Sequence, residues 1–445
     1  MDLLNLPEFN IIDISDNEYD IQIRVEASSP PLACPHCGCV ANLYKHDSRE
    51  QVCMDLPIHG KRVGLHIRRK RYRCRECSQT FWERLERTTI DDKRNCTQRL
   101  VIYIGRQSLK RSFTSIAEDV GMNEKTVRNI FRDYINELEQ LVQFETPRWL
   151  GIDEIHIINK PRCVIANVEE RTVVDMLHNR NKETVVNYLY RLPNKERITH
   201  VTMDMWQPYR DAVKAVLPKA TIIVDKFHVV RMANQAMETI RKQLREGLTT
   251  KQRRGLMHDR FILLKRHKEL TDMDKVTLDL WTKNHPSLGT AYKLKEAYFD
   301  IWDCDSRQKA FLEYHDWKAK IPKELKPAFE PLTKAMANWE EEVFSYFDHR
   351  ITNAYTESLN SLIRVMNRIG RGYSFEALRA KILFTEGVMK QAKPKYVKDF
   401  RSDFAHLPED HPHRKHPPIG IITDMGAFLG TDISTLIAKL EEGSL

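Results

Sequence analysis

The stretch RWLGIDEIHI, residues 148–157, decides the fold. Its apolar and β-branched residues predict a strand, in a chain that elsewhere mixes charged and apolar residues at helical spacing. An acid, Asp153, lies in the middle of this strand. The segments that follow predict strands at 162–168, 172–177, 198–205 and 221–224, and helices at 182–192 and 209–216. We therefore expect one island of strands within a mostly helical protein.

The predicted order β-β-β-α-β-α-β is that of an RNase H-like fold, in which the first and fourth strands lie side by side. Asp204 ends the fourth strand, so it would lie next to Asp153 on the first. Two adjacent carboxylates repel each other unless a cation lies between them. Carboxylate oxygens are ligands that Mg²⁺ prefers, so the pair predicts a site for one or two Mg²⁺ ions.

A third acid is expected from a later helix, in the segment NAYTESLNSLIR at 353–364. Helical spacing places four polar side chains along one face, namely Asn353, Glu357, Asn360 and Arg364. Glu357 would thus be presented by a rigid helix, with Asn353 and Asn360 in supporting positions. A lone helical glutamate is more often a solvated surface residue, and the joint placement of the three acids is what favours the catalytic interpretation.

The segment Asp225-Lys226-Phe227-His228 follows the last predicted strand. Asp225 could replace Asp204 as the second metal ligand. Alternatively, Asp225 and His228 form a supporting pair in which the carboxylate orients the imidazole. A lone aspartate after a strand also commonly caps a helix. The residues alone leave these alternatives open.

Paired cysteines mark the N-terminal part. Two CxxC pairs supply four thiols with the spacing of a tetrahedral structural zinc site, namely Cys34, Cys37, Cys74 and Cys77. His36 and Cys39 lie near enough to substitute as ligands, but the paired spacing favours the four cysteines. The remaining cysteines, including Cys53 and Cys96, are expected to be buried thiols.

A basic hairpin separates the two cysteine pairs, with segments expected around 52–54 and 63–73. Its second segment carries a run of cations that predicts contact with DNA phosphates, namely Arg68, Arg69, Lys70, Arg71 and Arg73. The alternative is a solvated charged edge that blocks strand pairing.

A helix-turn-helix is predicted next, with a first helix at 97–110 and a second at 115–120. Gly121 would supply the turn, and Asn123 would cap the recognition helix. Three side chains of this helix face outward, where they would meet the major groove, namely Lys125, Arg128 and Asn129. A generic helical hairpin is the alternative.

The net charge of +9 is compatible with a nucleic-acid partner and equally with a basic soluble enzyme. No apolar run approaches the ~20 residues that span a bilayer, and the first ten residues do not resemble a signal peptide. We therefore expect a cytoplasmic protein without a membrane partner, and metal-bound or free cysteines rather than disulfides.

The expected organisation is a multi-domain α/β protein. We predict a zinc-binding DNA-contact domain at 1–93, a helix-turn-helix at 94–145, an RNase H-like catalytic domain at 146–231 and 349–400, an all-helical insertion at 232–348, and a tail at 401–445. The insertion holds four tryptophans, which we expect mostly in its core. Its basic residues, such as Arg241 and Arg253, could line DNA. The histidine- and proline-rich stretch at 406–418 is expected to be a linker.

Taken together, the motifs resemble those of ISL-three family insertion-sequence transposases over nearly the whole chain. The resemblance is carried by CPHC and CREC, GIDE at 151–154, TMDMWQPYR at 202–210, VDKFHVVR at 224–231 and NAYTESLNSLIR at 353–364. The turn Arg371-Gly372-Tyr373 is also similar.

The resemblance implies a DDE transposase of a bacterial insertion sequence, which binds terminal inverted repeats and cleaves and transfers DNA strands with Mg²⁺ or Mn²⁺. Asp153, Asp204 and Glu357 would be the catalytic triad. The spacing of Asp225 and His228 is similar to the (C/D)xxH element of DDE enzymes, which favours Asp204 as the second acid. Two element ends must be held together, which implies a homodimer or higher oligomer in the active complex.

Two other functions are compatible with the residues. One is a DNA-binding regulator that has kept the transposase fold without its activity, against which the intact triad argues. The other is a structure-selective nuclease of the same fold, which would cut DNA without terminal repeats and would not join strands.

Overall fold

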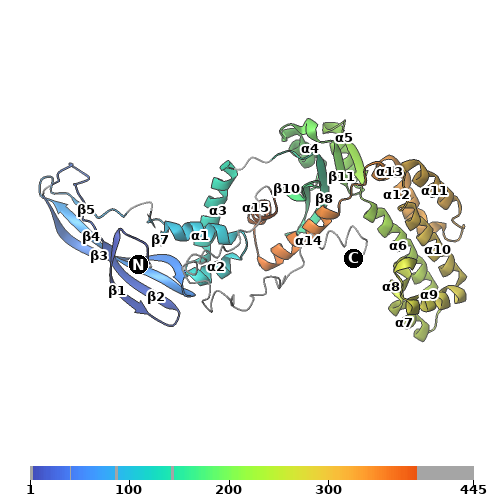
Figure 1. The fold of residues 1–445 in the computed structure, drawn as a ribbon, viewed down its shortest axis with the longest axis horizontal. Helices are drawn as coiled ribbons and strands as arrows, with labels where there is room; N and C mark the ends of the chain where they lie inside the picture. The colour runs from blue at the N-terminus through green and yellow to red at the C-terminus, as the bar shows by residue number, and fades with distance from the viewer. Residues whose placement is uncertain (1–3, 41, 86–88, 142–144, 388–445) are drawn as a thin grey trace, which may run out of the picture. The chain divides into compact units, whose positions relative to one another are not determined.

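The computed structural model of the chain describes residues 4–40, 42–85, 89–141 and 145–387 (Figure 1). The predicted tail from residue 401, with its histidine-rich stretch, lies outside the described residues. The chain divides into two compact units. Unit 1 contains residues 1–144 and 365–389, and unit 2 contains residues 145–364 and 390–445. In the described part of the chain, no helix has the length and apolarity needed to cross a membrane.

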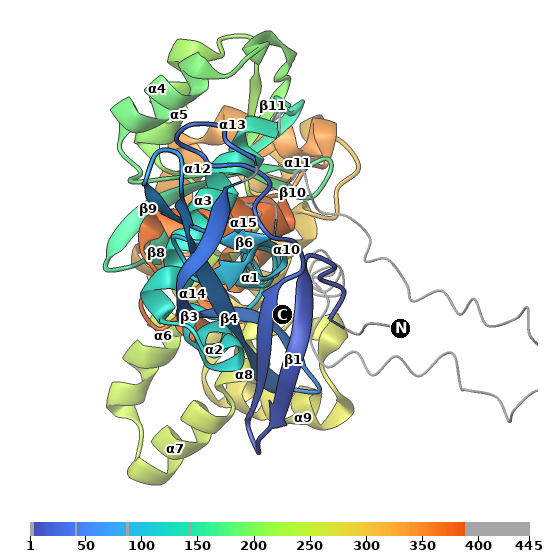
Figure 2. The same cartoon turned by 90° about the vertical axis from the view of Figure 1, so that its left-hand side faces the viewer.

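A seven-stranded sheet forms the N-terminal part of unit 1 (Figure 2). Its strands are β1 (Phe9–Asp16), β2 (Asp20–Ala27), β3 (Leu43–Ile58), β4 (Lys61–Cys74), β5 (Thr80–Trp82), β6 (Ile90–Asp91) and β7 (Cys96–Thr97), in the order β1-β2-β4-β3-β7-β6, with β5 also paired to β4. The predicted hairpin is the long antiparallel pair β3–β4, which turns at His59 and Gly60 with positive φ angles of 53° and 77°. Strands β1 and β2 were not expected from the sequence.

Three helices follow the sheet, namely α1 (Gln98–Ser108), α2 (Phe113–Val120) and α3 (Glu124–Leu141). The local signals that predicted them are confirmed. Gly121 ends α2 in the left-handed conformation with φ 69°. The side chain of Asn123 accepts a hydrogen bond from the Lys125 N–H at 2.8 Å, which caps α3. The turn chemistry therefore fixes where the recognition helix begins.

A fourth helix of unit 1, α15 (Phe375–Glu386), comes from the far end of the described chain. Its Lys381 is buried, and the Nζ donates hydrogen bonds to the carbonyl oxygens of Ser108 and Arg111 at the end of α1. The same ammonium lies 4.7 Å from the ring centre of Phe113 and 5.2 Å from that of Phe131. One side chain thus ties α15 to all three preceding helices.

Unit 2 contains a five-stranded sheet in the order β10-β9-β8-β11-β12. The strands are β8 (Trp149–Ile157), β9 (Lys160–Asn167), β10 (Thr172–Leu177), β11 (His200–Met203) and β12 (Thr221–Val224). The first three pair antiparallel, whereas β8, β11 and β12 pair parallel. The central strand is β8. It pairs with β11, which confirms the prediction that the first and fourth strands are neighbours.

Helices cover both faces of this sheet. On one face, α4 (Lys182–Arg191) and α5 (Gln207–Val216) bury the apolar side chains of β8 and β11, including Leu150 and Ile152. The alternate residues Gly151 and Asp153 point to the other face. There they meet α14 (Ala354–Ile369). Its Thr356, and Asn353 directly before it, lie against Gly151.

The chain between β12 and α14 is helical, as predicted for most of its length. It forms α6 (Lys226–Leu244), α7 (Thr250–His258), α8 (Arg260–Leu264), α9 (Asp272–Asn284), α10 (Pro286–Ile301), α11 (Arg307–Ala319), α12 (Lys326–Asn338) and α13 (Glu340–His349), with 3-10 turns at Arg245–Gly247 and His267–Glu269. A further 3-10 turn, Lys195–Arg197, precedes β11. Three of its tryptophans are buried in one apolar core, namely Trp302, Trp317 and Trp339.

One expectation for these helices is wrong. Arg241 does not lie on an exposed basic face, because it is buried on α6. Its Nε and Nη2 each donate a hydrogen bond of 3.0 Å to Glu238. This bidentate pair completes the packing of the helix, so the guanidinium of Arg241 is not available to DNA.

Replacing the buried lysine of α15 tests its role in unit 1. We expect Lys381→Met to lower the free energy of unfolding by about 1–3 kcal/mol, because two buried carbonyl oxygens lose their donor. Amide hydrogen exchange of the full chain measures the change, which should be confined to α1–α3 and α15. Lys110→Met, at an exposed position on the same unit, is the matched control. Equal protection in both variants would contradict the assigned role.

Candidate metal centres

Two acids meet where β8 and β11 pair. The parallel register sets Thr202 opposite Gly151 and Met203 opposite Ile152, so the next residues, Asp204 and Asp153, are neighbours. Asp153 is buried, and its pKa is raised well above the usual range, first by burial and then by the negative charge of Asp204. The structure therefore places two of the predicted site residues in direct electrostatic contact.

Helix α14 packs closely on β8 at Gly151. A Cβ on Gly151 would lie 2.6 Å from the Thr356 Oγ1 and 2.9 Å from the Asn353 Oδ1, so any larger residue here would displace the helix. Asn353 is fully buried, and its Oδ1 accepts a hydrogen bond of 3.1 Å from the Thr202 hydroxyl. This contact anchors the start of α14 to β11.

One helical turn after Glu357, Asn360 reaches the first acid. Its Nδ2 donates a hydrogen bond of 2.7 Å to the Asp153 Oδ2, while the backbone N–H of Glu154 donates to the Oδ1 at 2.7 Å. Both oxygens of Asp153 are therefore oriented by the protein. The predicted supporting residues thus contact the two strands that carry the acids. Asn353 contacts β11, and Asn360 contacts β8.

His228 lies between two further carboxylates. Its Nε2 is 3.1 Å from the Asp204 Oδ2, and its Nδ1 is 3.9 Å from the Asp225 Oδ2. Burial by itself lowers the pKa of His228, but the hydrogen bond to Asp204 and the charges of both carboxylates raise it to about 10. The histidine is thus an imidazolium at neutral pH and holds Asp204 in place.

Glu357 faces the same cluster from α14. Ligand atoms of Asp225, His228 and Glu357 all lie within 4.8 Å of one another, which is compatible with a shared cation. Burial, followed by the charge of Asp225, raises the pKa of Glu357. Arg231 on α6 approaches it at 3.6 Å with a guanidinium that is 64% exposed. The sequence analysis missed Arg231, although its helical spacing from His228 places the two on one face.

The donor set fits a hard divalent cation. Four carboxylates converge, and the Asp204 Oδ1 and Asp225 Oδ2 are buried without a hydrogen-bond partner in the described residues. A cation coordinated by these oxygens would satisfy them and relieve the repulsion that otherwise favours protonation of Asp153 and Glu357. Oxygen ligands of this kind suit Mg²⁺ or Mn²⁺.

A cleft of about 470 Å³ opens beside the acids. Asp204 and His228 line it on one side, and Lys334 and Asn338 of α12 line it on the other. The half-exposed Trp206 also borders the cleft, and Arg180 stacks on its ring at 4.4 Å and pairs with Glu154. The sequence analysis did not single out Trp206 or Arg180, because their meeting depends on the loops that follow β10 and β11.

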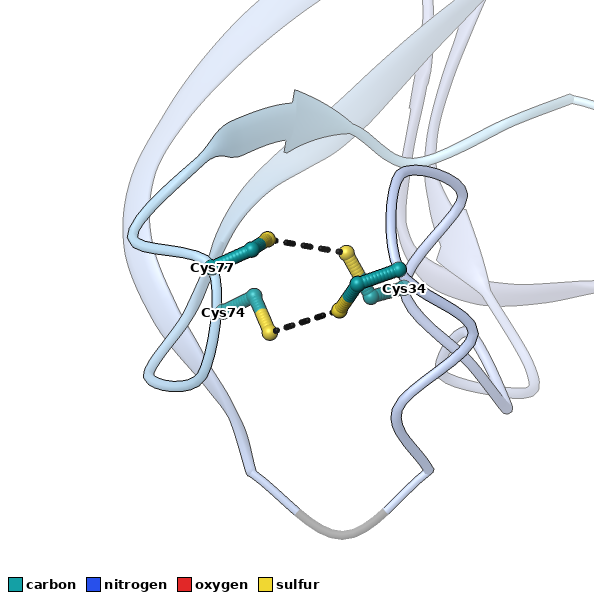
Figure 3. Close-up of side chains that lie close together, drawn as sticks. Cys34, Cys74 and Cys77 are labelled. Atoms are coloured by element: carbon teal, nitrogen blue, oxygen red, sulfur yellow. Dashed lines mark hydrogen bonds between the residues drawn. The ribbon is translucent and has the colours of Figure 1, made fainter.

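The four predicted zinc ligands come together in unit 1 (Figure 3). The sulfurs of Cys34 and Cys77 are 3.7 Å apart, and those of Cys37 and Cys74 are 3.6 Å apart. Tetrahedral zinc with bonds of about 2.3 Å sets its sulfurs about 3.8 Å apart, which fits this cluster.

Backbone amides act on the thiols of the second knuckle. Hydrogen bonds from the backbone of Cys77 lower the pKa of Cys74 to about 7. The backbone of Gln79 also acts to lower the pKa of Cys77, but burial and neighbouring thiols raise it overall. In the first knuckle, Gly38 takes a positive φ of 74° and its N–H bonds to the Cys34 carbonyl at 2.9 Å. Both turns therefore direct thiols toward a common point.

The predicted DNA-contact residues differ in their surroundings. On β4, Arg68 is exposed, whereas Arg69 donates to the Glu83 carbonyl, Lys70 pairs with Glu26, and Arg71 donates to the Thr80 hydroxyl. Arg73 is half-buried on the same strand. Much of the charge of this hairpin is thus held by contacts inside unit 1, and its role in DNA contact stays a prediction.

On α3, the outward positions predicted for DNA contact are accessible to different degrees. Lys125 and Arg128 are exposed, and Asn129 is half-buried. Arg128 pairs with Glu124 at 2.6 Å. Such an exposed pair is weak, so a phosphate or base edge can replace the glutamate at small cost.

Family models match three parts of the chain. A family model described as a transposase, of the ISL3 type, matches residues 150–382. Models described as the zinc-finger of transposase IS204/IS1001/IS1096/IS1165 and the helix-turn-helix domain of transposase family ISL3 match residues 30–77 and 89–135.

Two kinds of curated relative are similar in sequence. The transposase for insertion sequence element IS1001 of Bordetella parapertussis is 23% identical over 362 residues, covering 79% of this chain and 88% of the relative. The transposase for insertion sequence element IS1557 of Mycobacterium tuberculosis is 25% identical over 305 residues, covering 62% and 68%. With its family model matched over more than half of its length, this chain belongs to the ISL3 family of transposases.

Proposed function

We propose that the chain is the DDE transposase of a bacterial insertion sequence, which binds terminal inverted repeats and catalyses metal-dependent cleavage and transfer of DNA strands. The observation that carries this proposal is a cluster of four carboxylates. Asp153 and Asp204 lie on neighbouring strands, and Asp225 and Glu357 lie within reach of one cation. The names of the relatives and the helix-turn-helix support DNA as the substrate.

The proposed architecture follows the strand order. The sheet β10-β9-β8-β11-β12 with α4, α5 and α14 would be an RNase H-like catalytic domain, and α6–α13 would be an all-helical insertion within it. The proposed domains are 1–93, 94–145, 146–231, 232–348 and 349–400, with a tail at 401–445. Unit 1 includes residues 365–389, so the proposed catalytic domain would not contain α15. An assembly of at least two chains in the cytoplasm would hold two element ends together for cutting.

Asp153, Asp204 and Glu357 would hold two divalent ions, Mg²⁺ or Mn²⁺. Such ions supply charge stabilisation at a phosphate and lower the pKa of a bound water. The residues around the acids would keep the ligands in place, since Asn360 orients Asp153 and His228 orients Asp204. Arg231, exposed beside Glu357, would bind a substrate phosphate.

The proposed reaction has two steps of the same type. Attack of water on the phosphodiester at an element end breaks the bond to the 3′ oxygen and releases a 3′-OH and a 5′-phosphate. That 3′-OH then attacks a target phosphodiester, forming a new ester bond while the target strand loses its own 3′ oxygen as the leaving group. Both are in-line displacements, so one arrangement of acids serves both.

Asp204 is favoured over Asp225 as the second acid by accessibility. Asp204 lines the cleft, whereas Asp225 is fully buried, and its Oδ1 accepts the Phe227 N–H at 3.3 Å as the cap of α6. His228 lies between Asp204 and Asp225 and is close to both, which supports a positioning role for it.

Replacing the first and third acids of the proposed triad, Asp153 and Glu357, tests the reaction. We expect Asp153→Asn and Glu357→Gln to reduce Mg²⁺-dependent cleavage of a duplex carrying the element end to the level without metal, with DNA affinity retained. Asp211→Asn on α5, which pairs with Lys182, is the control and should leave cleavage unchanged. Cleavage by neither wild type nor control, with specific binding intact, would instead support a regulator. Cleavage of branched duplexes without end sequence and without joining would support a nuclease.

The two remaining aspartates are distinguished by the same assay. We expect Asp204→Asn to abolish cleavage, because it removes a metal ligand. Asp225→Asn should lower the rate about 10–100-fold, as expected for a residue that orients His228. Full activity of Asp204→Asn together with an inactive Asp225→Asn would reverse the assignment.

The cysteine cluster makes a separate prediction. Purified protein should contain about one zinc ion per chain, and Cys34→Ser should lose it because a structural site needs all four ligands. Zinc content measured by metal analysis, with hydrogen exchange in β3–β5, checks this. Cys39→Ser should retain the metal, since Cys39 lies outside the cluster of four. Loss of zinc in Cys39→Ser alone would show that the ligand set is wrong.

A further inference from the structure

The turn between α14 and α15 belongs to unit 1, together with the helix-turn-helix. Helix α15 packs on the helix-turn-helix through the buried Lys381 and through an ion pair of 3.8 Å between Arg379 and Glu139 of α3. The sequence match to the helix-turn-helix ends at residue 135, and residues 371–382 fall within the match to the catalytic domain. The structure therefore extends the DNA-binding unit beyond the part that sequence comparison assigns to it.

Tyr373 fixes this turn to the helix-turn-helix. Its ring is 5% exposed and packs edge-on against Phe113 of α2, with the ring centres 5.2 Å apart. Its hydroxyl donates a hydrogen bond of 3.3 Å to the Arg111 carbonyl oxygen. The Lys381 ammonium lies over the same ring at 4.7 Å. These three contacts hold the turn from both sides.

Two glycines are required for the shape of the turn. A Cβ on Gly370 would lie 2.1 Å from the Tyr373 ring, so no other residue leaves the ring in its place. Gly372 has a φ of 118°, a conformation that L-residues rarely adopt. Between them, Arg371 takes a positive φ of 45°. In this constrained turn the side chain of Arg371 is exposed to solvent.

Arg371 is an exposed cation whose side chain takes no part in the packing of the unit. Among the described residues, its side chain has no hydrogen bond, ion pair or ring contact. By contrast, Arg379 on the following helix pairs with Glu139 of α3. A backbone conformation that is costly for arginine, kept in a turn that buries none of its side chain, points to a binding role rather than a structural one.

The recognition helix is close to this turn. Arg128 of α3 lies 5.4 Å over the ring of Phe113, the same ring that Tyr373 contacts. Cations that flank a recognition helix commonly bind the sugar-phosphate backbone, while the helix itself reads base edges. The turn therefore offers a positive charge where the DNA backbone would pass a helix inserted in the major groove.

We propose that Arg371, held by the Gly370–Tyr373 turn, binds a phosphate of the DNA whose major groove receives α3. The DNA-binding module is thus discontinuous in sequence and includes the segment 370–386. This inference rests on the proposed binding of DNA by the helix-turn-helix. It adds a contact that reads no sequence and that sets the position of the helix on the duplex.

The salt dependence of DNA affinity tests this contact. Full-length Arg371→Ala should bind both an element-end duplex and an unrelated duplex about three- to tenfold more weakly, and its plot of log affinity against log salt should lose about one unit of slope. Arg371→Lys should keep the wild-type slope, because the charge is preserved. Arg24→Ala is the matched control, since it removes another exposed arginine, on β2 of the same unit.

The outcomes separate this inference from the proposed function. If the wild type binds and Arg371→Ala keeps the wild-type slope, Arg371 contacts no phosphate and the inference is wrong. A loss that affects only the element-end duplex would also overturn it, because a phosphate contact weakens all sequences. If the wild type binds neither duplex, the proposed function fails first. The melting temperature of Arg371→Ala should match that of the wild type, because its side chain is exposed.

Discussion

The acid cluster of unit 2 depends on a close contact between α14 and β8, at a position where β8 carries no side chain. Gly151 leaves room for the side chains of Thr356 and Asn353, which lie where a Cβ would otherwise be. That proximity lets Asn360 bond to Asp153 and brings Glu357 toward Asp225 and His228. A larger residue at position 151 would push the helix outward and separate the third acid from the other two.

Electrostatics explains why so much of the surrounding structure serves the acids. Four carboxylates lie close together, and burial makes their mutual repulsion stronger than it would be in water. The protein offsets part of this charge with the imidazolium of His228 and the guanidinium of Arg231. The pKa values of Asp153 and Glu357 are raised, first by burial and then by the charge of Asp204 and Asp225 respectively. Buried carboxylate oxygens that lack a hydrogen-bond partner, as in this cluster, are suitable ligands for a divalent cation.

Local patterns made much of this structure predictable. Gly121 and Asn123 predicted the turn before the recognition helix and the cap at its start. The order of the predicted strands indicated that Asp153 and Asp204 would be neighbours. Strands β1 and β2 were missed, since seven of the eight residues of β1 are exposed and give no buried face to detect. The cysteine spacing indicated the knuckles, but that the two turns would face each other depends on the long hairpin between them.

The part that could not be predicted depends on contacts between distant segments. The sequence analysis did not single out Lys381, because Phe113 and Phe131, whose rings enclose its ammonium, lie far from it in the sequence. The basic run on β4 suggested free cations, yet Arg69 and Lys70 have partners supplied by Glu83 and Glu26 from elsewhere in the unit. Charge counted along a strand does not reveal which charges are already paired.

The enclosed lysine of α15 also has a consequence for how such transposases can diverge. Phe113, Phe131 and Tyr373 line one shared pocket, although more than 200 residues of catalytic sequence separate the last from the first two. A transplanted N-terminal segment would bring α1–α3 without the α15 that packs on them. A functional exchange of these helices between two such proteins would therefore need α15 to be transferred with them.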